Sequence, residues 1–350
     1  MTFDTQPYNC EPIDRLSQGE HGTVSPRKEK LAELPNSTDT NPRRTVAEQL
    51  LEQALEQQQT NQLTAASRSG QQALLLYREL QDRRGEAQAL SSLSNIYYAL
   101  GDYAQAINYG SRRLAIAREL QDYRAEGQAL GSLGNAYRHL QDYVKALDCQ
   151  LQSLTVARLI HDDRGEVAAL NNLGLAYKAL KEYPKAIEYL QQGLTIAQNL
   201  QDHPIEAQIL RNLGNIYHAL GDYTKTIDYY EQRLAIAQAT HDRQSENQVL
   251  KNLGSACSSL GNYTKAIIYL RQRLRLTQTL QDRRGEEQVL SSLAVVYEAL
   301  GDYPKAIEYH EQRLAIAREI GDRRVEAQVM GSLKIACYAL GDYAKILEYQ

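Results

Sequence analysis

The chain repeats itself every 40 residues, and this period constrains its fold more than any other feature of the sequence. The clearest markers are an aspartate and a tyrosine that each recur at this spacing. They stand at Asp82, Asp122, Asp162, Asp202, Asp242, Asp282 and Asp322, and at Tyr103, Tyr143, Tyr183, Tyr223, Tyr263, Tyr303 and Tyr343. A fixed period of about 20–50 residues is typical of solenoids, in which each unit packs only against its neighbours. We therefore predict one elongated repeat array, although a chain of 350 residues would otherwise indicate several domains.

The repeat divides the chain into four parts. Residues 1–42 are polar, rich in proline and without a sustained period, so they cannot bury enough apolar surface to offset their ordering entropy. We expect them to be a disordered leader. Residues 43–82 keep the period loosely and are interpreted as a degenerate N-terminal capping repeat. Residues 83–322 hold six full 40-residue units, and residues 323–350 form an incomplete C-terminal repeat.

Each unit reads as two helices, so the predicted fold is all-α. Asp202 suits the N-cap of a first helix, because its carboxylate can accept hydrogen bonds from the free amides of the first turn. Gly221 suits a left-handed residue that ends this helix, and Asp222 suits the cap of the second helix. Gly214 lies inside the first helix, where glycine costs about 1 kcal/mol relative to alanine. This glycine predicts a close approach of the second helix, with the two helices packed antiparallel.

The sequence pattern of the units resembles the tetratricopeptide repeat. The matching pattern is Leu213-Gly214-x-x-Tyr217, followed by Gly221-Asp222-Tyr223 and then Ile227. The 40-residue spacing is similar to the long-repeat branch of that family, which includes G-protein-signalling modulators, kinesin light chains and many cyanobacterial arrays. The resemblance covers residues 43–350 and implies a right-handed α–α superhelix. It is specific for the fold and says little about function, because one fold hosts many functions.

The resemblance also implies a concave groove lined by the first helix of each unit, where an extended peptide or a partner helix lies. Three rows of positions carry over to this groove, with one residue per unit in each row. The first row begins at Asn95, the second at Ser92 and the third at Gln88, and each continues at steps of 40 residues. Their polar members are mostly amides and serines. The predicted groove residues are Gln88, Ser92, Asn95, Gln128, Asn135, Arg138, Asn172, Lys178, Gln208, Arg211, Asn212, Asn215, His218, Gln248, Lys251 and Asn252. Asparagine amides both donate and accept hydrogen bonds, so a ladder of them could pair with a peptide backbone. The alternative is a solvated polar helix face without a role in binding.

Four of these groove positions carry a positive charge and fall in the middle units, which favours an acidic peptide or a terminal carboxylate as the ligand. They are Arg138, Lys178, Arg211 and Lys251. The three-repeat carboxylate clamp known in the family is not reproduced here, because the second and third groove rows hold no Lys or Arg. The alternative is that these charges are solvated and bind nothing.

Composition and motifs disfavour the other classes of function. The net charge of −4 lacks the basic excess of a general nucleic-acid binder. Arg271, Arg273 and Arg275 form a local basic run, but Glu286 and Glu287 follow soon after, which favours a solvated face. The sequence contains no phosphate-binding loop, dinucleotide fingerprint, nucleophile elbow or zinc-helix motif. We therefore predict no catalytic site, no cofactor and no metal, and we do not interpret the dyads His161-Asp162 and His241-Asp242 as a metal site.

The cysteines and the N-terminus indicate a cytoplasmic protein. Three cysteines, Cys149, Cys257 and Cys337, stand at positions where other units have tyrosine, so we predict that they are buried core residues. Together with Cys10 they show no paired spacing. The sequence has neither an evident signal peptide nor an apolar run long enough for a membrane span.

Three functional hypotheses follow. The first is a non-enzymatic scaffold or adaptor that binds a partner peptide in its groove. The second is a regulatory or sensor array from a longer protein, with an effector domain of the caspase-like CHAT type beyond Gln350; the unfinished last unit motivates it. The third is an RNA-binding helical repeat, which would bind nucleic acid with a steep dependence on salt.

Overall fold

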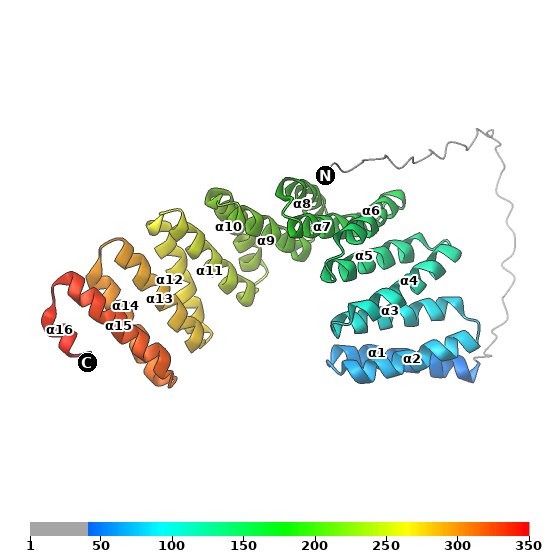
Figure 1. The fold of residues 1–350 in the computed structure, drawn as a ribbon, viewed down its shortest axis with the longest axis horizontal. Coiled ribbons are helices and arrows are strands. Elements are labelled where there is room, and N and C mark those ends of the chain that lie inside the picture. Colours follow the sequence, from blue (N-terminus) through cyan, green and yellow to red (C-terminus); the bar gives the residue numbers. More distant parts are fainter. Residues whose placement is uncertain (1–40, 350) are drawn as a thin grey trace, which may run out of the picture. The chain divides into compact units, whose positions relative to one another are not determined.

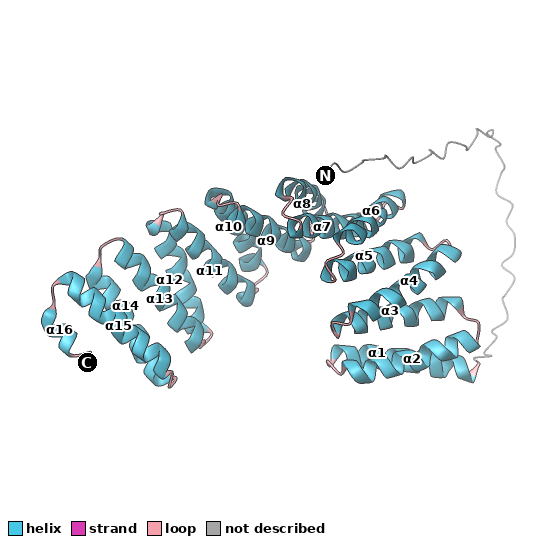
Figure 2. Ribbon diagram, viewed as in Figure 1, coloured by secondary structure: helices cyan, strands magenta, loops and turns pink. Residues whose placement is uncertain are grey.

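The computed structural model describes residues 41–349, and in this range the chain forms sixteen α-helices and no β-strand (Figures 1 and 2). The prediction of an all-α superhelix built from helix pairs is confirmed. The predicted leader lies almost entirely outside the described residues. Its last residue, Pro42, begins the first helix instead, where a proline is tolerated because the first amides of a helix have no partner within it.

The helices alternate along the chain between a first and a second member of each pair. The first members are α1 (Pro42–Gln59), α3 (Arg83–Ala99), α5 (Tyr123–His139), α7 (Asp163–Ala179), α9 (His203–Ala219), α11 (Arg243–Ser259), α13 (Arg283–Ala299) and α15 (Arg323–Leu340). The second members are α2 (Leu63–Glu79), α4 (Tyr103–Glu119), α6 (Tyr143–Leu159), α8 (Tyr183–Asn199), α10 (Tyr223–Ala239), α12 (Tyr263–Thr279), α14 (Tyr303–Glu319) and α16 (Tyr343–Leu347). Each helix packs against the one before it, and from α1 to α9 neighbouring first members also contact one another.

Aspartates cap most of these helices, as the repeat predicts. The side chain of Asp202 accepts a hydrogen bond from the amide of Ile205, and that of Asp222 accepts one from the amide of Lys225 at 3.0 Å. The cap of α8 differs, because Glu182 occupies it and makes no such bond. A glutamate is one methylene longer than an aspartate, so its carboxylate does not reach the first-turn amides in the same way.

Left-handed residues close the turns between helices. Gly221 has a φ of 76°, which confirms the prediction that a glycine ends the first helix of a pair. The turns between units use other residues in the same conformation, such as Gln201 at 54° and His241 at 55°. A side chain at such a position costs roughly 1–2 kcal/mol. The hydrogen bonds that end the helices hold this conformation, since the amide of Asp202 donates to the carbonyl of Ala197 at 3.1 Å.

Glycines inside the first helices allow the close packing that the sequence predicts. A Cβ added to Gly214 would lie 2.5 Å from Cε1 of Tyr230, and one added to Gly174 would lie 2.5 Å from Cγ of Leu190. Both neighbouring side chains belong to the second helix of the same unit and are buried. The core therefore runs continuously between the paired helices of each unit.

The cysteine prediction is confirmed for the part of the chain that the structure describes. Cys149, Cys257 and Cys337 are free thiols buried in the core, whereas Cys10 lies outside the described residues. Within residues 41–349, none of the helices combines the length and the hydrophobicity that crossing a bilayer requires.

Candidate functional site

The third of the predicted groove rows is exposed along the first helices. Gln88, Gln128, Gln208 and Gln248 come one per unit from α3, α5, α9 and α11, and all four are exposed. The first row is more mixed, with Asn95 exposed and with Asn135 and Asn215 half-buried.

Two residues of the second row are wrongly placed by the sequence prediction. Ser92 and Asn212 are buried, with exposed fractions of 5% and 4%. The side-chain amide of Asn212 on α9 donates to the side-chain oxygen of Asn171 on α7 at 2.8 Å. Asn212 is therefore part of the contact between neighbouring first helices and is removed from the candidate site. Ser92, although buried, lines a pocket together with Gln88 and Asn95, and Asn172 and Asn252 of the same row are half-buried.

Several other predicted groove amides already have partners on the protein. Tyr230 donates its hydroxyl to the side-chain oxygen of Asn215 at 2.7 Å. Gln248 donates to the side-chain oxygen of Asn252 at 3.1 Å. Asn172, half-buried on α7, donates to Gln150 at 3.5 Å. A ligand would compete with these bonds or use the remaining donors and acceptors of the same amides.

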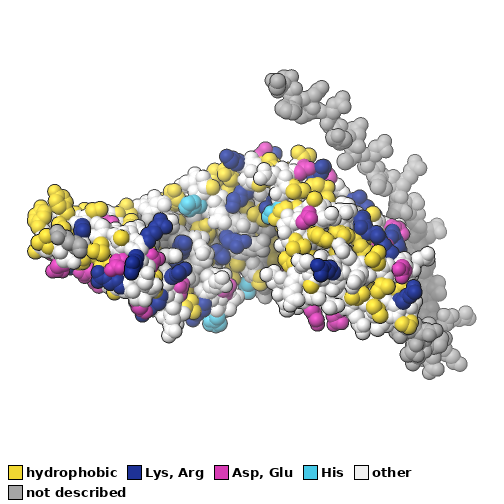
Figure 3. Space-filling model, turned by 60° about the horizontal axis from the view of Figure 1, so that its bottom comes forward, with side chains coloured by type: hydrophobic (Ala, Val, Ile, Leu, Met, Phe, Trp, Pro, Cys, Tyr) yellow, Lys and Arg dark blue, Asp and Glu magenta, His cyan; other side chains and the backbone are white. Residues whose placement is uncertain are grey.

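The four predicted cations lack acidic partners within residues 41–349. Arg138 and Lys178 are half-buried, Arg211 and Lys251 are exposed, and none of the four forms a salt bridge in that range. Burial and the charge of Arg211 lower the pKa of Lys178. Figure 3 shows Lys and Arg side chains in the hollowed middle of the face turned to the viewer.

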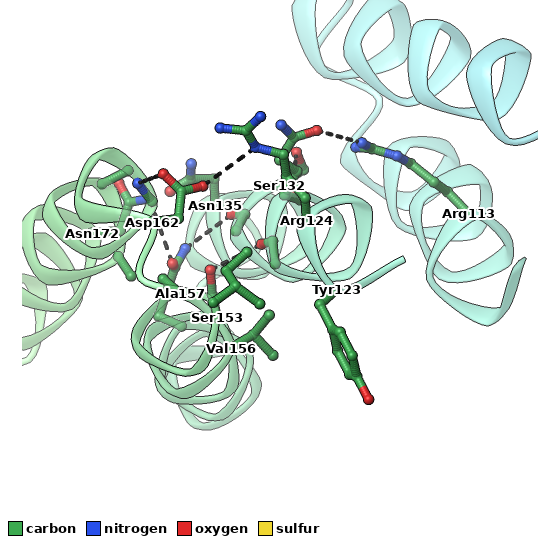
Figure 4. A pocket seen from close by; sticks show the side chains of 18 of the residues that line it. Arg113, Tyr123, Arg124, Ser132, Asn135, Ser153, Val156, Ala157, Asp162 and Asn172 are labelled. Carbon is green, nitrogen blue, oxygen red and sulfur yellow. Dashed lines mark hydrogen bonds and ion pairs between the residues drawn. The ribbon is translucent and has the colours of Figure 1, made fainter. Parts of the chain in front are cut away.

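The largest concentration of predicted groove residues surrounds a pocket of about 380 Å³ between α3, α5, α6 and α7 (Figure 4). Asn95, Gln128, Asn135 and Asn172 all line it, together with Ser132. The pocket thus collects side chains from three successive first helices. Of the other predicted residues, Asn215, His218 and Asn252 line a separate hollow of about 180 Å³ with Tyr230.

Small residues create this pocket. Gly127 and Gly131 lie on α5, and Ser153 faces them from α6. The hydroxyl of Ser153 donates to the carbonyl of Gly127 at 2.9 Å, and the amide of Gln150 donates to the carbonyl of Gly131 at 2.9 Å. A Cβ added to Gly131 would meet only the hydroxyl of Ser153, at 3.7 Å. The space above this glycine is therefore open.

These pocket-forming residues were missed by the sequence prediction. The last unit also has a glycine at the position of Gly131, namely Gly331, but the units between and before them have larger residues, which are Ser91, Asn171, Arg211, Lys251 and Ser291. The position of Ser153 is held by Arg233, Arg273 and Arg313 in later units. A pair of glycines four residues apart on one first helix was the available signal.

Arginines stand at the rim of the pocket. Arg113 donates to the side-chain oxygen of Gln128 at 2.8 Å, and burial lowers the pKa of its guanidinium. Arg124 lies 3.7 Å from the carboxylate of Asp162, which also accepts from the amide of Gly165 as a helix cap. The lining therefore offers amide donors and acceptors with a partly positive rim. Such a surface can hydrogen-bond an extended peptide along its backbone.

Family models match most of the repeat array. A tetratricopeptide repeat model matches residues 126–199, 205–279 and 286–350. A second tetratricopeptide repeat model matches residues 89–122. A comparison with curated protein sequences gave no match.

Solved structures show the same fold at low sequence identity. A signal-transduction ATPase with numerous domains and a tetratricopeptide repeat sensor, from Pyrococcus horikoshii, is similar with a TM-score of 0.62 and 18% identity, over 86% of this chain and 45% of that one. BtubC from P. vanneervenii is similar with a TM-score of 0.54 and 20% identity, over 70% of this chain and 93% of that one. The apo form of the quorum sensor NprR from B. thuringiensis is similar with a TM-score of 0.52 and 14% identity, over 87% of this chain and 86% of that one.

Proposed function

The chain belongs to the tetratricopeptide repeat family, and we propose that it is a non-enzymatic scaffold whose first helices hold an extended segment of a partner protein. The observation that carries this proposal is the pocket above Gly127 and Gly131. Amide side chains from three successive first helices converge there, at a position where most other units have larger side chains.

The amides explain how such a segment would be held. An extended peptide presents one donor and one acceptor per residue, and each must be paired when water is excluded. Gln128 and Asn135 both lie on α5, while Asn95 and Asn172 approach from the helices on either side. This arrangement offers bonds along the line of the peptide and leaves room for a side chain in the hollow.

The charges favour an acidic partner. Lys178, Arg211 and Lys251 form no salt bridge within the described part of the chain. Charges of one sign in a groove raise the association rate and the selectivity for the opposite charge. The proposed partner segment therefore carries Asp or Glu side chains opposite α7, α9 and α11.

A regulatory role is compatible with the same mode of binding. The printed title of the Pyrococcus horikoshii ATPase describes its repeats as a sensor, and this chain spans less than half of that protein. In a sensor array of this chain, the partner segment bound in the groove would be the ligand that is sensed. The binding experiment below addresses the step that an adaptor and a sensor would share.

The experiment compares two substitutions at the same repeat position. Gly131→Leu fills the pocket, whereas Gly331→Leu adds the same side chain where a Cβ would meet no atom within 4 Å. Tagged wild-type and variant proteins, checked for equal helicity and melting, are used to capture partners from a native lysate. We expect a protein that is captured by the wild type and by Gly331→Leu and lost with Gly131→Leu. Equal capture by all three proteins would contradict the proposed site.

A further inference from the structure

Arg233 on α10 is a buried cation that lacks the partners its counterparts have. The residue is 7% exposed, and its Nε and Nη1 atoms are buried without a hydrogen-bond partner among residues 41–349. An unpaired buried guanidinium is costly, because a charge taken out of water normally requires a carboxylate or several hydrogen bonds. The guanidinium of Arg233 therefore lacks the compensation that a buried charge normally has.

In the two later units, the arginine at this position has a hydrogen-bond acceptor. Arg313, two units further on, donates its Nε to the carboxylate of Glu287 at 2.6 Å. Arg273, in the unit between, donates to the side-chain oxygen of Asn247 at 2.8 Å. In each case the acceptor lies 26 residues earlier on the first helix of the same unit.

The unit of Arg233 has no acceptor at this position. The corresponding residue is Ala207, whose side chain carries no polar atom. Gln248 donates its side-chain amide to Asn252, and its side-chain oxygen does not accept from the Nε or Nη1 atom of Arg233. The missing side chain leaves a pocket of about 260 Å³ lined by Ala207, Arg233 and Asp242.

This pocket, called the Arg233 slot below, occupies the same place in its unit as the pocket above Gly127 and Gly131, two units earlier in the chain, which is called the glycine pocket. Ala207, Arg233 and Asp242 take the places of Gly127, Ser153 and Asp162. The glycine pocket extends to the groove amides of its unit. Next to the Arg233 slot, the groove residue Gln208 directly follows Ala207 on α9. Arg211, four residues after Ala207, faces the same side of α9.

The charges around the slot are mainly positive. Burial and the neighbouring charge of Arg211 lower the pKa of Arg233, and Arg211 has the same influence on Lys178. Asp242 is the nearest acid, but it forms no salt bridge with Arg233 and accepts from the amide of Ser245 as the cap of α11. The field in the slot therefore favours an added negative charge.

We propose that Arg233, assisted by Arg211, binds the carboxylate of an acidic side chain from the partner segment. This inference rests on the proposed groove function. The proposed contact has a counterpart within the chain, because the carboxylate of Glu287 accepts a hydrogen bond from Arg313. In the unit of Arg233 the carboxylate comes from the ligand, since the space that a glutamate would fill is empty of protein atoms.

The test places the missing acid in the chain. Ala207→Glu should pair with Arg233 as Glu287 pairs with Arg313, whereas Ala235→Glu makes the same change at an exposed position of α10 outside the groove. The probe is a fluorescein-labelled octaglutamate peptide, with octaglutamine as the neutral control, and anisotropy is measured at low salt. We expect the wild type to prefer octaglutamate by about tenfold or more, which corresponds to about 1.4 kcal/mol.

The two variants should then differ. We expect Ala207→Glu to abolish this preference and to raise the melting temperature, and Ala235→Glu to keep most of the preference. A wild type without the preference, an equal loss in both variants, or a lower melting temperature for Ala207→Glu would overturn the inference. The groove function is judged separately: if Gly131→Leu loses the captured partner while Ala207→Glu binds octaglutamate like the wild type, the groove stands and only the role of Arg233 fails.

Discussion

At the scale of single residues, the array shows how one position on the second helix changes character from unit to unit. Arg313 has a carboxylate partner, Arg273 has an amide partner and Arg233 has neither. Such differences can be read from the sequence only after the 26-residue offset between the partners is known. The offset depends on how the second helix crosses the first, which the repeat period alone does not supply.

The pair in the last full unit gives a direct test of this offset. Glu287→Ala should destabilise the protein by roughly 3–5 kcal/mol, because it leaves the guanidinium of Arg313 buried without its partner. Asn247→Ala, the matched change one unit earlier, should cost only about 1–2 kcal/mol because a neutral acceptor is lost. Urea denaturation of both variants measures the difference. Equal losses would show that Glu287 and Arg313 are not an essential buried pair.

Burial of the thiols leads to a second prediction. Desolvation raises the pKa of Cys149 and of Cys257 to about 11, and also raises the pKa of Cys337. In a Cys10→Ser variant, we expect almost no reaction with a thiol reagent at pH 8 in the native state, and three reactive thiols after unfolding. A thiol that reacts rapidly in the folded variant would contradict the described core.

The same shifts fix a direction for the dependence of stability on pH. The folded state keeps its thiol protons to a higher pH than the unfolded chain, whose thiols have a pKa of about 8.5. The thiol contribution is therefore fully present below that pH and is lost as the pH rises toward about 11. Chemical denaturation between these pH values, compared with a variant that lacks the thiols, measures this contribution.

At the scale of helices, the period predicted the elements well because capping and packing use the same residues in every unit. The aspartate caps and the glycine at the end of the first helix are local features, determined by a few neighbouring residues. The turns between units were less predictable, because Gln201 and His241 adopt a conformation that their own side chains disfavour.

The N-terminus of α8, where Glu182 makes no capping hydrogen bond, provides a prediction at this scale. Glu182→Asp should stabilise the protein by about 0.5–1 kcal/mol, because the shorter carboxylate can accept from the first-turn amides of α8. Asp142 makes this bond at 3.2 Å while it also pairs with Lys145 at 2.9 Å, so the present pair of Glu182 with Lys185 need not be lost. Thermal melting measures the gain, with Glu182→Ala as the control. A loss of stability in the aspartate variant would show that the longer side chain has another role.

The candidate site was predicted in part. The exposed glutamine row followed from the position of these residues on the first helix, and the structure exposes Gln88, Gln128, Gln208 and Gln248. Asn212 was misplaced because its burial depends on the distance between neighbouring first helices. The pocket above Gly127 and Gly131 depends on small side chains from both helices of one unit, so neither helix reveals it alone.

At the scale of the whole array, the described units share a fold but offer different surfaces. The pocket at Gly131 is rich in amides and has arginines at its rim, whereas the pocket at Arg233 contains a buried arginine without a hydrogen-bond partner for its Nε and Nη1 atoms among residues 41–349. A segment that contacts both would need polar backbone contacts at one point and an acidic side chain at another. Repeat arrays allow such variation because each unit contacts only its neighbours and can change independently.

The most direct measurement for the groove is site-specific crosslinking to the captured partner. A photoreactive p-benzoylphenylalanine replaces Gln128 on the exposed face of α5, or, as the control, Thr155 on the exposed face of α6. The account predicts a crosslinked partner from position 128 and none from position 155. A crosslink from position 155 alone would show that the partner binds the second helices, and would contradict the proposed groove.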